Sequence, residues 1–380
     1  MQSDGRWALQ SEPYSCYFGG SAEYLSCFAQ TIGESELWAM HLALHPQANL
    51  LSVSRKRYAR LSTRDNKLCM DSNIPWGMDS LITLVYLDEK YSLKTCDNRF
   101  LSNDGKLVME HRPNTSFTLE LKSGKLAFKD CEGKFLSRTG PTGTLKSGRC
   151  SRPGKGELFD LEESHPQVSR QPTKDMNYSI RLLGCVISAN QDDETDMETF
   201  QMEIDKETKK CMFRTNGGNY WTLVTHGGFL STATEAANNG KYVCTKKNGQ
   251  LAAVREDEQF MLKLINRPIL VLRGENGFVC HHKTSNTLDC SRSVYDIFSL
   301  LFSDGAYQIK SESYCYCFWF VSSSGLVCTD GNKPEDFFFE FVEYGRVAIK
   351  GQNSKYLRGD QGGTLMGDGL SVDASSLWEH

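Results

Sequence analysis

The chain has 380 residues, of which 39% are hydrophobic and 24% charged, and its formal net charge is −4. This composition is ordinary for a globular protein, and no apolar run approaches the ~18 residues that a membrane span needs. The acidic balance argues against a general nucleic-acid binder, so we expect neither a nucleic-acid partner nor membrane insertion. The first residues lack a basic stretch followed by an apolar one, which predicts a cytoplasmic protein without a signal peptide.

The cysteines point to the same compartment. The fourteen cysteines follow no regular spacing, and no two of them form a C-x-x-C pair. A disulfide framework or a structural zinc site would show such regularity. We therefore expect reduced thiols in a cytosolic protein.

A short motif returns along the chain as a tight turn, an aromatic residue, a short apolar step, a second turn and then Leu or Val. The clearest copies lie at 132–145, 239–251 and 353–365. Successive aromatic residues are 35 to 43 residues apart, except for an interval of 22 residues between Tyr220 and Tyr242. A period of this size indicates a repeat architecture.

Between these turns lie runs that alternate apolar and polar residues, at 117–128, 200–204, 298–309 and 338–349. A Gly-containing turn interrupts the three longer runs, which is typical of β-hairpins. With the strands beside each aromatic turn, every 40 residues supply four short strands. The chain is therefore predicted to be all-β, and only 34–45 could form a helical turn.

Four-stranded repeats allow two closed architectures, propellers and threefold barrels. The spacing of three prolines distinguishes between them. Pro46 and Pro166 are 120 residues apart, which equals three repeats, and Pro268 marks a third equivalent point. A higher period of three favours tandem β-trefoils over a ring of blades. The predicted domains are a remnant of a first trefoil at 1–45, then trefoils at 46–163, 164–265 and 266–380.

The third trefoil is predicted to lack one hairpin. Pro166 and Pro268 are only 102 residues apart, and the short aromatic interval falls in the same region. The missing hairpin would follow 233–237, at the step from Ala237 to Asn238. Because a trefoil buries its core by closing a barrel, we expect this one to be open, while the second and fourth trefoils close.

Catalytic and metal-binding patterns are absent from the sequence. The stretch 140–147 has Leu145 where a phosphate-binding loop needs glycine. His281 and His282 are adjacent, so a strand would point them to opposite faces, and the acidic run 190–196 lacks the mid-loop glycine of a calcium loop. No nucleophile, base and orienting group are visible together. We expect a binding protein, not an enzyme, with no cofactor and no metal.

Basic residues cluster at several turns. Each cluster taken alone is typical of a solvated turn. Several clusters on one rigid, mildly acidic body favour recognition of an acidic polymer at more than one face. The clusters are Arg55, Lys56 and Arg57; Lys146, Arg149, Arg152 and Lys155; Lys246 and Lys247; and Arg273, Lys350 and Arg358.

Long motifs distributed along the whole chain resemble the fascin family of actin-bundling proteins. They lie at 25–30, 53–58, 75–84, 129–133, 188–196, 246–253, 264–268 and 376–379. The motifs at 50–54, 223–228 and 277–282 are similar to the retinal branch, which is associated with photoreceptors. The resemblance implies four tandem β-trefoils and the crosslinking of filamentous actin into parallel bundles in filopodia, microvilli and stereocilia.

The resemblance also implies which residues face actin. Arg55, Lys56 and Arg57 match a basic triplet of the family, and Glu275 matches an acidic position at the face between the first and last trefoils. Arg358 stands at the basic position of that face. The other matching basic positions are Lys146, Arg152 and Lys155 on the second trefoil and Lys246 on the third.

Measured against the family, the chain starts inside the last third of the first trefoil and carries the internal deletion. Bundling needs two actin sites on one stiff body. We therefore expect a monomer that binds filaments weakly and in a salt-sensitive way and bundles them poorly. The alternative is a carbohydrate-binding β-trefoil lectin, but the six tryptophans form no Gln-x-Trp repeat.

Overall fold

The computed structural model describes residues 6–21, 24–38, 42, 44–171, 179–183, 186–191, 196, 198–208, 210–223, 229–233, 242–245, 251–254, 261–311 and 317–380. Across these ranges the chain consists of strands, turns and short 3-10 helices, without an α-helix. The prediction of an all-β protein is confirmed. The chain forms two compact units, Met1–Pro75 with Ile82–Glu163 (unit 1) and Trp76–Leu81 with Ser164–His380 (unit 2).

Unit 1 contains a two-stranded sheet, a twelve-stranded sheet and three 3-10 turns. The elements are β1 (Tyr17–Gly20), β2 (Leu25–Ala29), η1 (Glu34–Glu36), β3 (Gln47–Ser52), β4 (Arg57–Ser62), β5 (Lys67–Ser72), β6 (Ile82–Leu87), β7 (Lys90–Lys94), β8 (Phe100–Leu101), β9 (Leu107–Val108), η3 (Pro113–Thr115), β10 (Thr118–Lys122), β11 (Lys125–Lys129), β12 (Leu136–Thr139), β13 (Thr144–Ser147), η4 (Lys155–Glu157) and β14 (Phe159–Glu163).

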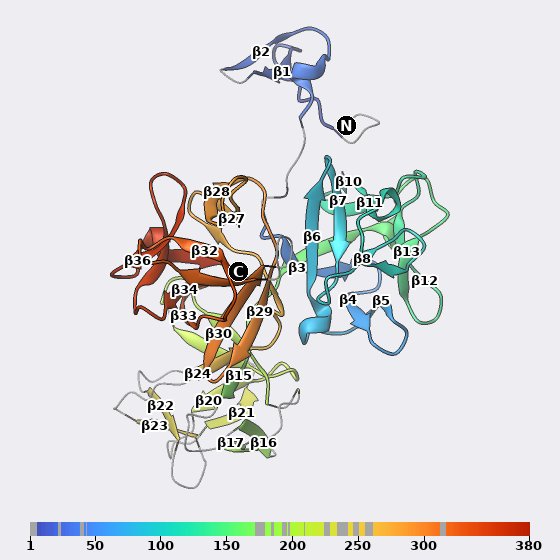
Figure 1. Ribbon diagram of the computed structural model, residues 1–380. Coiled ribbons are helices and arrows are strands. Elements are labelled where there is room, and N and C mark those ends of the chain that lie inside the picture. The colour runs from blue at the N-terminus through green and yellow to red at the C-terminus, as the bar shows by residue number, and fades with distance from the viewer. Residues whose placement is uncertain are drawn as a thin grey trace. The chain divides into compact units, whose positions relative to one another are not determined.

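The twelve-stranded sheet joins its own first and last strands. β14 pairs antiparallel with β3, from Phe159 opposite Ser52 to Glu163 opposite Ala48. The inward side chains form one apolar cluster, to which Leu50, Phe128 and Phe159 belong, each with no exposed surface. The hairpins β4–β5 and β12–β13 lie at one end of this barrel (Figure 1), where Thr144 of β13 pairs with Cys69 of β5.

Unit 2 holds sheets of eight, two and thirteen strands. Its elements are η2 (Met78–Ser80), β15 (Gln167–Gln171), β16 (Ser179–Leu183), β17 (Val186–Gln191), β18 (Phe200–Ile204), β19 (Cys211–Arg214), β20 (Tyr220–Leu223), β21 (Phe229–Ala233), β22 (Tyr242–Thr245), β23 (Leu251–Val254), β24 (Met261–Leu264), β25 (Ile269–Leu270), β26 (Arg273–Gly274), β27 (Gly277–His281), β28 (Leu288–Arg292), β29 (Phe298–Ser303), β30 (Ala306–Ser311), β31 (Phe318–Val321), β32 (Val327–Gly331), β33 (Phe337–Glu343), β34 (Arg346–Gly351), β35 (Tyr356–Gly359), β36 (Leu365–Gly369), η5 (Ala374–Ser376) and β37 (Leu377–Glu379).

The core of unit 2 is continuous across two of its sheets. Val168 and Leu264 of the eight-stranded sheet belong to the same buried cluster as Phe298 and Trp319 of the thirteen-stranded sheet. The hydroxyl of Tyr307 also donates to the Leu262 carbonyl at 2.7 Å and accepts from the Leu264 amide at 2.8 Å. These two sheets therefore share their apolar interior and a buried polar bridge.

Residues 6–21 and 24–38 contain the small two-stranded sheet β1–β2. Trp7 and Trp38 are joined by an isolated bridge, and Phe18 lies 6.4 Å from the Trp38 ring. Phe28 on β2 is 83% exposed. Among the described residues of 34–45, the structure has one 3-10 turn, η1.

The division into four trefoils stays a prediction. The sheets of 47–163 and 269–379 have the strand number of a trefoil or one more, and the boundary between Glu163 and Ser164 separates the two units. Ala237 and Asn238, where the hairpin is predicted to be missing, lie outside the described residues. The prediction that the third barrel is open also falls largely outside them.

The alternation along β33 is testable by paired substitutions. Phe337 is fully buried beside Trp319, with ring centroids 6.5 Å apart, whereas its neighbour Phe338 is 41% exposed. We expect Phe337→Ala to lower the free energy of unfolding by about 3–5 kcal/mol and Phe338→Ala by less than about 1 kcal/mol. Urea unfolding of both variants measures this. Equal losses would contradict the assigned strand faces.

Candidate functional site

A tight turn between β3 and β4 carries the basic triplet. Ser52 pairs with Arg57, and the Lys56 amide donates to the Ser52 carbonyl at 2.9 Å, with Lys56 at φ +52°. All three side chains of the triplet are exposed. Three cationic groups therefore project from one end of one hairpin.

The pairing of β3 with β14 brings a second basic segment beside this turn. The Val53 amide donates to the Leu158 carbonyl at 3.0 Å, and the Val53 side chain packs against the buried cluster that contains Leu158 and Phe135. Lys155 opens η4, three residues before Leu158, and is exposed. Residues about 100 positions apart in the sequence thus form one basic surface.

The hairpin β12–β13 and the loop after it supply the remaining basic residues of unit 1. Lys146 lies opposite Ser137 and is exposed. The loop begins where the Gly148 amide donates to the Phe135 carbonyl at 2.8 Å, and Lys122 donates to the Pro153 carbonyl within it. Arg152 lies in this loop and is exposed.

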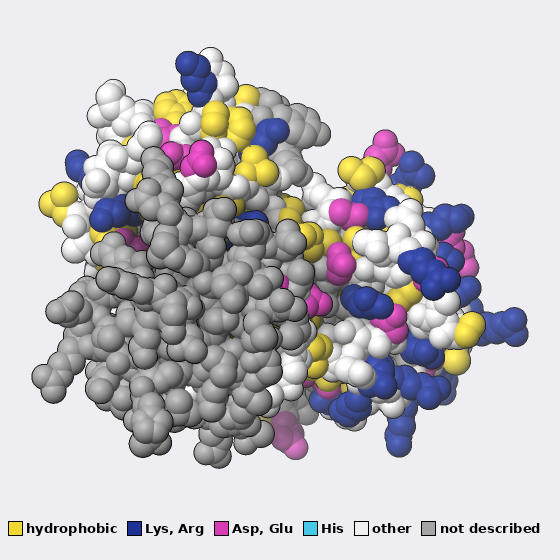
Figure 2. Space-filling model, turned by 90° about the horizontal axis from the view of Figure 1, so that it is seen from below, with side chains coloured by type: hydrophobic (Ala, Val, Ile, Leu, Met, Phe, Trp, Pro, Cys, Tyr) yellow, Lys and Arg dark blue, Asp and Glu magenta, His cyan; other side chains and the backbone are white. Residues whose placement is uncertain are grey.

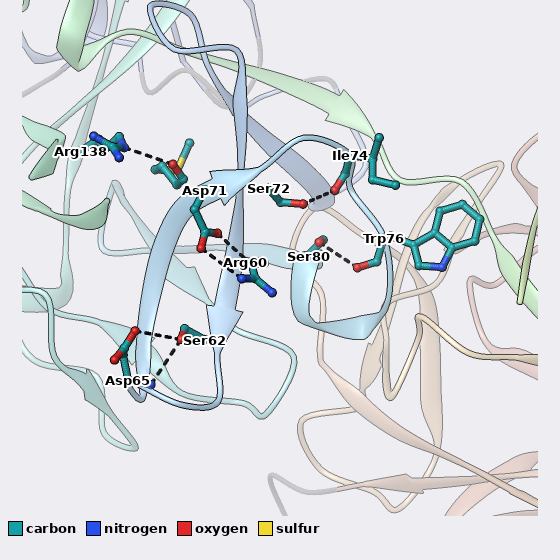
Figure 3. Close-up of polar contacts among 10 residues, drawn as sticks. Arg60, Ser62, Asp65, Asp71, Ser72, Ile74, Trp76, Ser80 and Arg138 are labelled. Carbon is teal, nitrogen blue, oxygen red and sulfur yellow. Dashed lines mark hydrogen bonds and ion pairs between the residues drawn. The ribbon is translucent and has the colours of Figure 1, made fainter. Parts of the chain in front are cut away.

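These six basic residues are free of ion pairs with any carboxylate that the structure describes. Some other basic residues of the same barrel are paired with carboxylates. Arg60 binds both carboxylate oxygens of Asp71, at 2.8 and 3.1 Å (Figure 3). Lys125 pairs with Asp160 at 2.7 Å and Arg112 with Glu110 at 2.9 Å. The six residues of the candidate site are Arg55, Lys56, Arg57, Lys146, Arg152 and Lys155.

The carboxylates in these ion pairs have lowered pKa values. The hydrogen bond from Arg60 lowers the pKa of Asp71 from its ordinary value. Hydrogen bonds from Lys106 and Ser102 lower the pKa of Asp104 to about 2. Both carboxylates therefore stay charged at neutral pH and cancel the cations beside them.

The barrel as a whole is basic although the chain is acidic. Residues 46–163 hold 20 of the 43 Lys and Arg residues but only 15 of the 47 Asp and Glu residues. Figure 2 shows Lys and Arg side chains gathered over this barrel, at the right of the view. A cationic surface of this kind attracts an acidic partner and raises the rate of encounter.

The other predicted site residues belong to unit 2. Glu275 is exposed in the turn between β26 and β27. Arg358 is half-buried and binds both carboxylate oxygens of Asp368, at 2.7 and 2.9 Å, and this hydrogen bonding raises the pKa of Arg358. Glu275 and Arg358, both among the described residues, share no ion pair. Lys246 lies outside the described residues.

One hydrogen-bonded Ser–His–Asp set was not visible in the sequence. The Nδ1 atom of His281 lies 2.7 Å from Asp296 Oδ2, and its Nε2 atom lies 2.9 Å from Ser311 Oγ. A nucleophile must reach its substrate, but Ser311 has no exposed surface. The hydrogen bonds of His281 therefore link β27 to β30, and the burial of Ser311 excludes a role as a nucleophile.

The described part of the chain contains no group of three or more His, Cys, Asp or Glu side chains suited to a metal ion. Within the same residues, no helix has the length and apolar character needed to cross a bilayer. The cysteines described are free thiols, among them the exposed Cys131 and Cys150.

Comparison with known proteins identifies the relatives of this chain. A Fascin domain matches residues 48–161, 177–239 and 275–380. Fascin-2 of Bos taurus is 54% identical over 401 residues, covering 100% of this chain and 81% of its own. Fascin-2 of Homo sapiens is 54% identical over 386 residues (96% and 78%), and Fascin of Strongylocentrotus purpuratus is 31% identical over 421 residues (100% and 82%).

The alignment with the bovine relative spans 401 positions, whereas this chain has 380 residues. Among solved structures, SeviL bound to asialo-GM1 saccharide has a TM-score of 0.29 and 13% identity, covering 32% of this chain and 100% of its own. The designed protein ThreeFoil has a TM-score of 0.28 and 14% identity (31% and 99%).

Thiol reactivity tests the surface and the core of the fold together. Burial raises the pKa of Cys280 to about 11 and of Cys290 to about 12. At pH 8 both remain protonated and slow to react, because the thiolate is the nucleophile. We expect iodoacetamide to modify exposed Cys131 and Cys150 in the folded chain, and Cys280 and Cys290 only after unfolding. Mass spectrometry measures the rate of modification at each cysteine. Equal rates for Cys290 and Cys150 would contradict the burial of Cys290.

Proposed function

Because this chain belongs to the fascin family, in its Fascin-2 branch, we propose that it binds filamentous actin and crosslinks filaments into parallel bundles. Members of this family act as structural proteins and not as enzymes. We place the protein in the cytoplasm, as a monomer on the actin cytoskeleton of cell projections such as filopodia, stereocilia and the processes of photoreceptors.

One observation supports the filament site above the others. Six exposed cations on one barrel lack a carboxylate partner among the described residues, while their neighbours Arg60, Arg112 and Lys125 are paired. An unpaired exposed cation can bind a carboxylate of a partner without first breaking an internal ion pair. Binding of this kind is screened by salt and contributes to specificity and to the association rate.

A second actin contact at Glu275 and Arg358 is less ready to bind. The Arg358 guanidinium holds both oxygens of Asp368, so an actin carboxylate would have to compete with an internal partner. A bidentate pair of this geometry is among the stronger hydrogen-bonded pairs. We propose that this contact forms with lower affinity than the one on unit 1.

Crosslinking requires two sites that engage at once on one stiff body. Residues 6–21 and 24–38 contain a two-stranded sheet with exposed aromatic residues such as Phe28. We propose that this form of the protein binds single filaments and bundles them poorly.

The filament site can be tested by removing its charges. The triple variant Arg55→Ala, Lys56→Ala, Arg57→Ala should weaken binding to filamentous actin by about tenfold, or about 1.4 kcal/mol, because three unpaired cations are lost. High-speed cosedimentation at 50 and 150 mM salt measures the affinity. The difference between the variant and the parent chain should shrink at the higher salt.

The matched control removes the same charge from paired positions. Arg112→Ala, Lys125→Ala, Lys129→Ala changes the net charge equally, but these residues bind Glu110, Asp160 and Glu120. We expect its affinity to stay within about twofold of the parent chain. If both triple variants weakened binding equally, overall charge and not this site would explain the interaction.

Poor bundling is tested by comparing two pelleting speeds. At protein concentrations that saturate filaments in the high-speed assay, this chain should bring down less actin at low speed than Fascin-2 of Bos taurus does. The reason is that the basic residues of unit 1 have no internal carboxylate partner, whereas Arg358 of unit 2 is bound to Asp368. Low-speed pellets of equal size would refute the proposed impairment.

A further inference from the structure

The loop between β13 and η4, residues 148–154, contains an exposed serine among basic residues. Ser151 follows Arg149 by two positions and directly precedes Arg152, and all three residues are exposed. Lys155 opens η4 four positions after Ser151. Protein kinases select many of their substrates by the pattern of charges around the acceptor residue. The sequence Arg149-Cys150-Ser151-Arg152 therefore suits a kinase whose substrate groove is acidic.

This loop is anchored at its two ends but not in its middle. The Gly148 amide is hydrogen-bonded to the barrel at one end, and Lys122 Nζ donates to the Pro153 carbonyl at 2.5 Å at the other. Between these anchors, residues 149–152 make no hydrogen bond to any other residue that the structure describes. A segment without such bonds changes its backbone conformation at low cost. The loop can therefore adopt the extended form that an enzyme groove requires.

Phosphorylation requires that the serine hydroxyl reach the active site of the kinase. The hydroxyl oxygen attacks the γ-phosphorus of ATP, the bond from that phosphorus to the departing ADP oxygen breaks, and the hydroxyl proton passes to the catalytic aspartate of the kinase. A serine that is buried, or whose hydroxyl is held by an internal partner, meets this requirement poorly. Ser151 is exposed, and its hydroxyl has no hydrogen-bond partner among the described residues.

Ser123 is a contrasting serine in the same barrel, exposed and flanked by lysines. It lies in the two-residue turn between β10 and β11, at φ +52°, where Lys122 pairs with Lys125 across the hairpin. Lys125 is bound to Asp160 at 2.7 Å, and Lys122 is bound to the Pro153 carbonyl. This turn cannot extend without breaking the hairpin, and its cations already have partners. We therefore expect Ser123 to be a poor acceptor.

We propose that Ser151 is a phosphorylation site for a Ser/Thr kinase that recognises basic sequences, and that its phosphate neutralises this part of the basic surface. A phosphoserine carries a charge of about −1.5 to −2 and forms charge-assisted hydrogen bonds with arginine. Arg149 and Arg152 have no carboxylate partner among the described residues, and the phosphate supplies an internal one. Both then resemble Arg60, which is bound to Asp71. The effect on actin binding rests on the proposed function; the modification itself does not.

The modification is tested on the full chain with MgATP and two purified kinases that prefer basic substrates, the catalytic domains of cAMP-dependent protein kinase and protein kinase C. Peptide mapping by mass spectrometry follows the phosphate at each serine over time. With at least one of the kinases, Ser151 should react about tenfold or more faster than Ser123. Arg149→Ala should slow the reaction at Ser151 about fivefold or more, whereas the matched control Arg112→Ala, which removes a paired cation elsewhere in the barrel, should not.

The loss of positive charge is measured without actin on a heparin column. The chain phosphorylated at Ser151 should elute at lower salt than the untreated chain, because fewer cations bind the polyanion. Kinase-treated Ser151→Ala should elute with its untreated form. In high-speed cosedimentation at low salt, phosphorylation should weaken binding to filamentous actin about three- to tenfold, and the kinase should leave binding by Ser151→Ala unchanged.

Three results would overturn the proposal. They are the absence of phosphate at Ser151 with both kinases, equal rates at Ser151 and Ser123, and an unchanged heparin elution when Ser151 is fully phosphorylated. Should Arg149→Ala fail to fold, the rates at the two serines of the native chain still decide the matter. If phosphorylation shifts the heparin elution but the untreated chain does not bind actin, the modification stands and the proposed function fails. Unchanged actin binding after phosphorylation of a chain that binds when untreated would overturn the effect on the filament site.

Discussion

The antiparallel pairing of β14 with β3 is the constraint on which the candidate site depends. It joins the first and last strands of the twelve-stranded sheet, so Phe159 can enter the same core as Leu50 and Phe128. The same pairing carries the turn that bears Arg55–Arg57 to the segment that begins at Lys155. Closure of the barrel and the position of the basic turns thus depend on the same strand pairing. A change that opened this strand pair would disperse the surface along with the core.

Electrostatics separates the basic residues of this barrel into two groups with different roles. Arg60 and Lys125 are neutralised by internal carboxylates, and such exposed pairs contribute little to stability. Arg55 and Lys155 are held on short turns of the barrel with no carboxylate partner among the described residues, so their backbone does not have to be ordered when they bind. This contrast explains how a chain with net charge −4 can present a cationic face. Arg358 belongs to the paired group, which distinguishes its position from that of the triplet.

Local patterns in the sequence predicted much of the fold, and contacts between distant residues account for what it could not show. The period-2 runs around Gly124 and Gly345 predicted the hairpins β10–β11 and β33–β34, because a hairpin is encoded within a dozen residues. Exposure of the triplet followed from its place in a turn. The Arg358–Asp368 pair and the contact of His281 with Ser311 arise only from strand register and barrel closure. The proline spacing could not predict that residues 76–81 belong to unit 2.

Zero-length carbodiimide crosslinking of this chain to filamentous actin, followed by mass spectrometry, tests the central claim most directly. The reagent joins a lysine to a carboxylate only where the two are already in contact. The account predicts that the crosslinked lysines of residues 46–163 are Lys56, Lys146 and Lys155, the unpaired members of the basic surface. Crosslinks confined to Lys106, Lys125 and Lys129, which bind internal carboxylates, would contradict it.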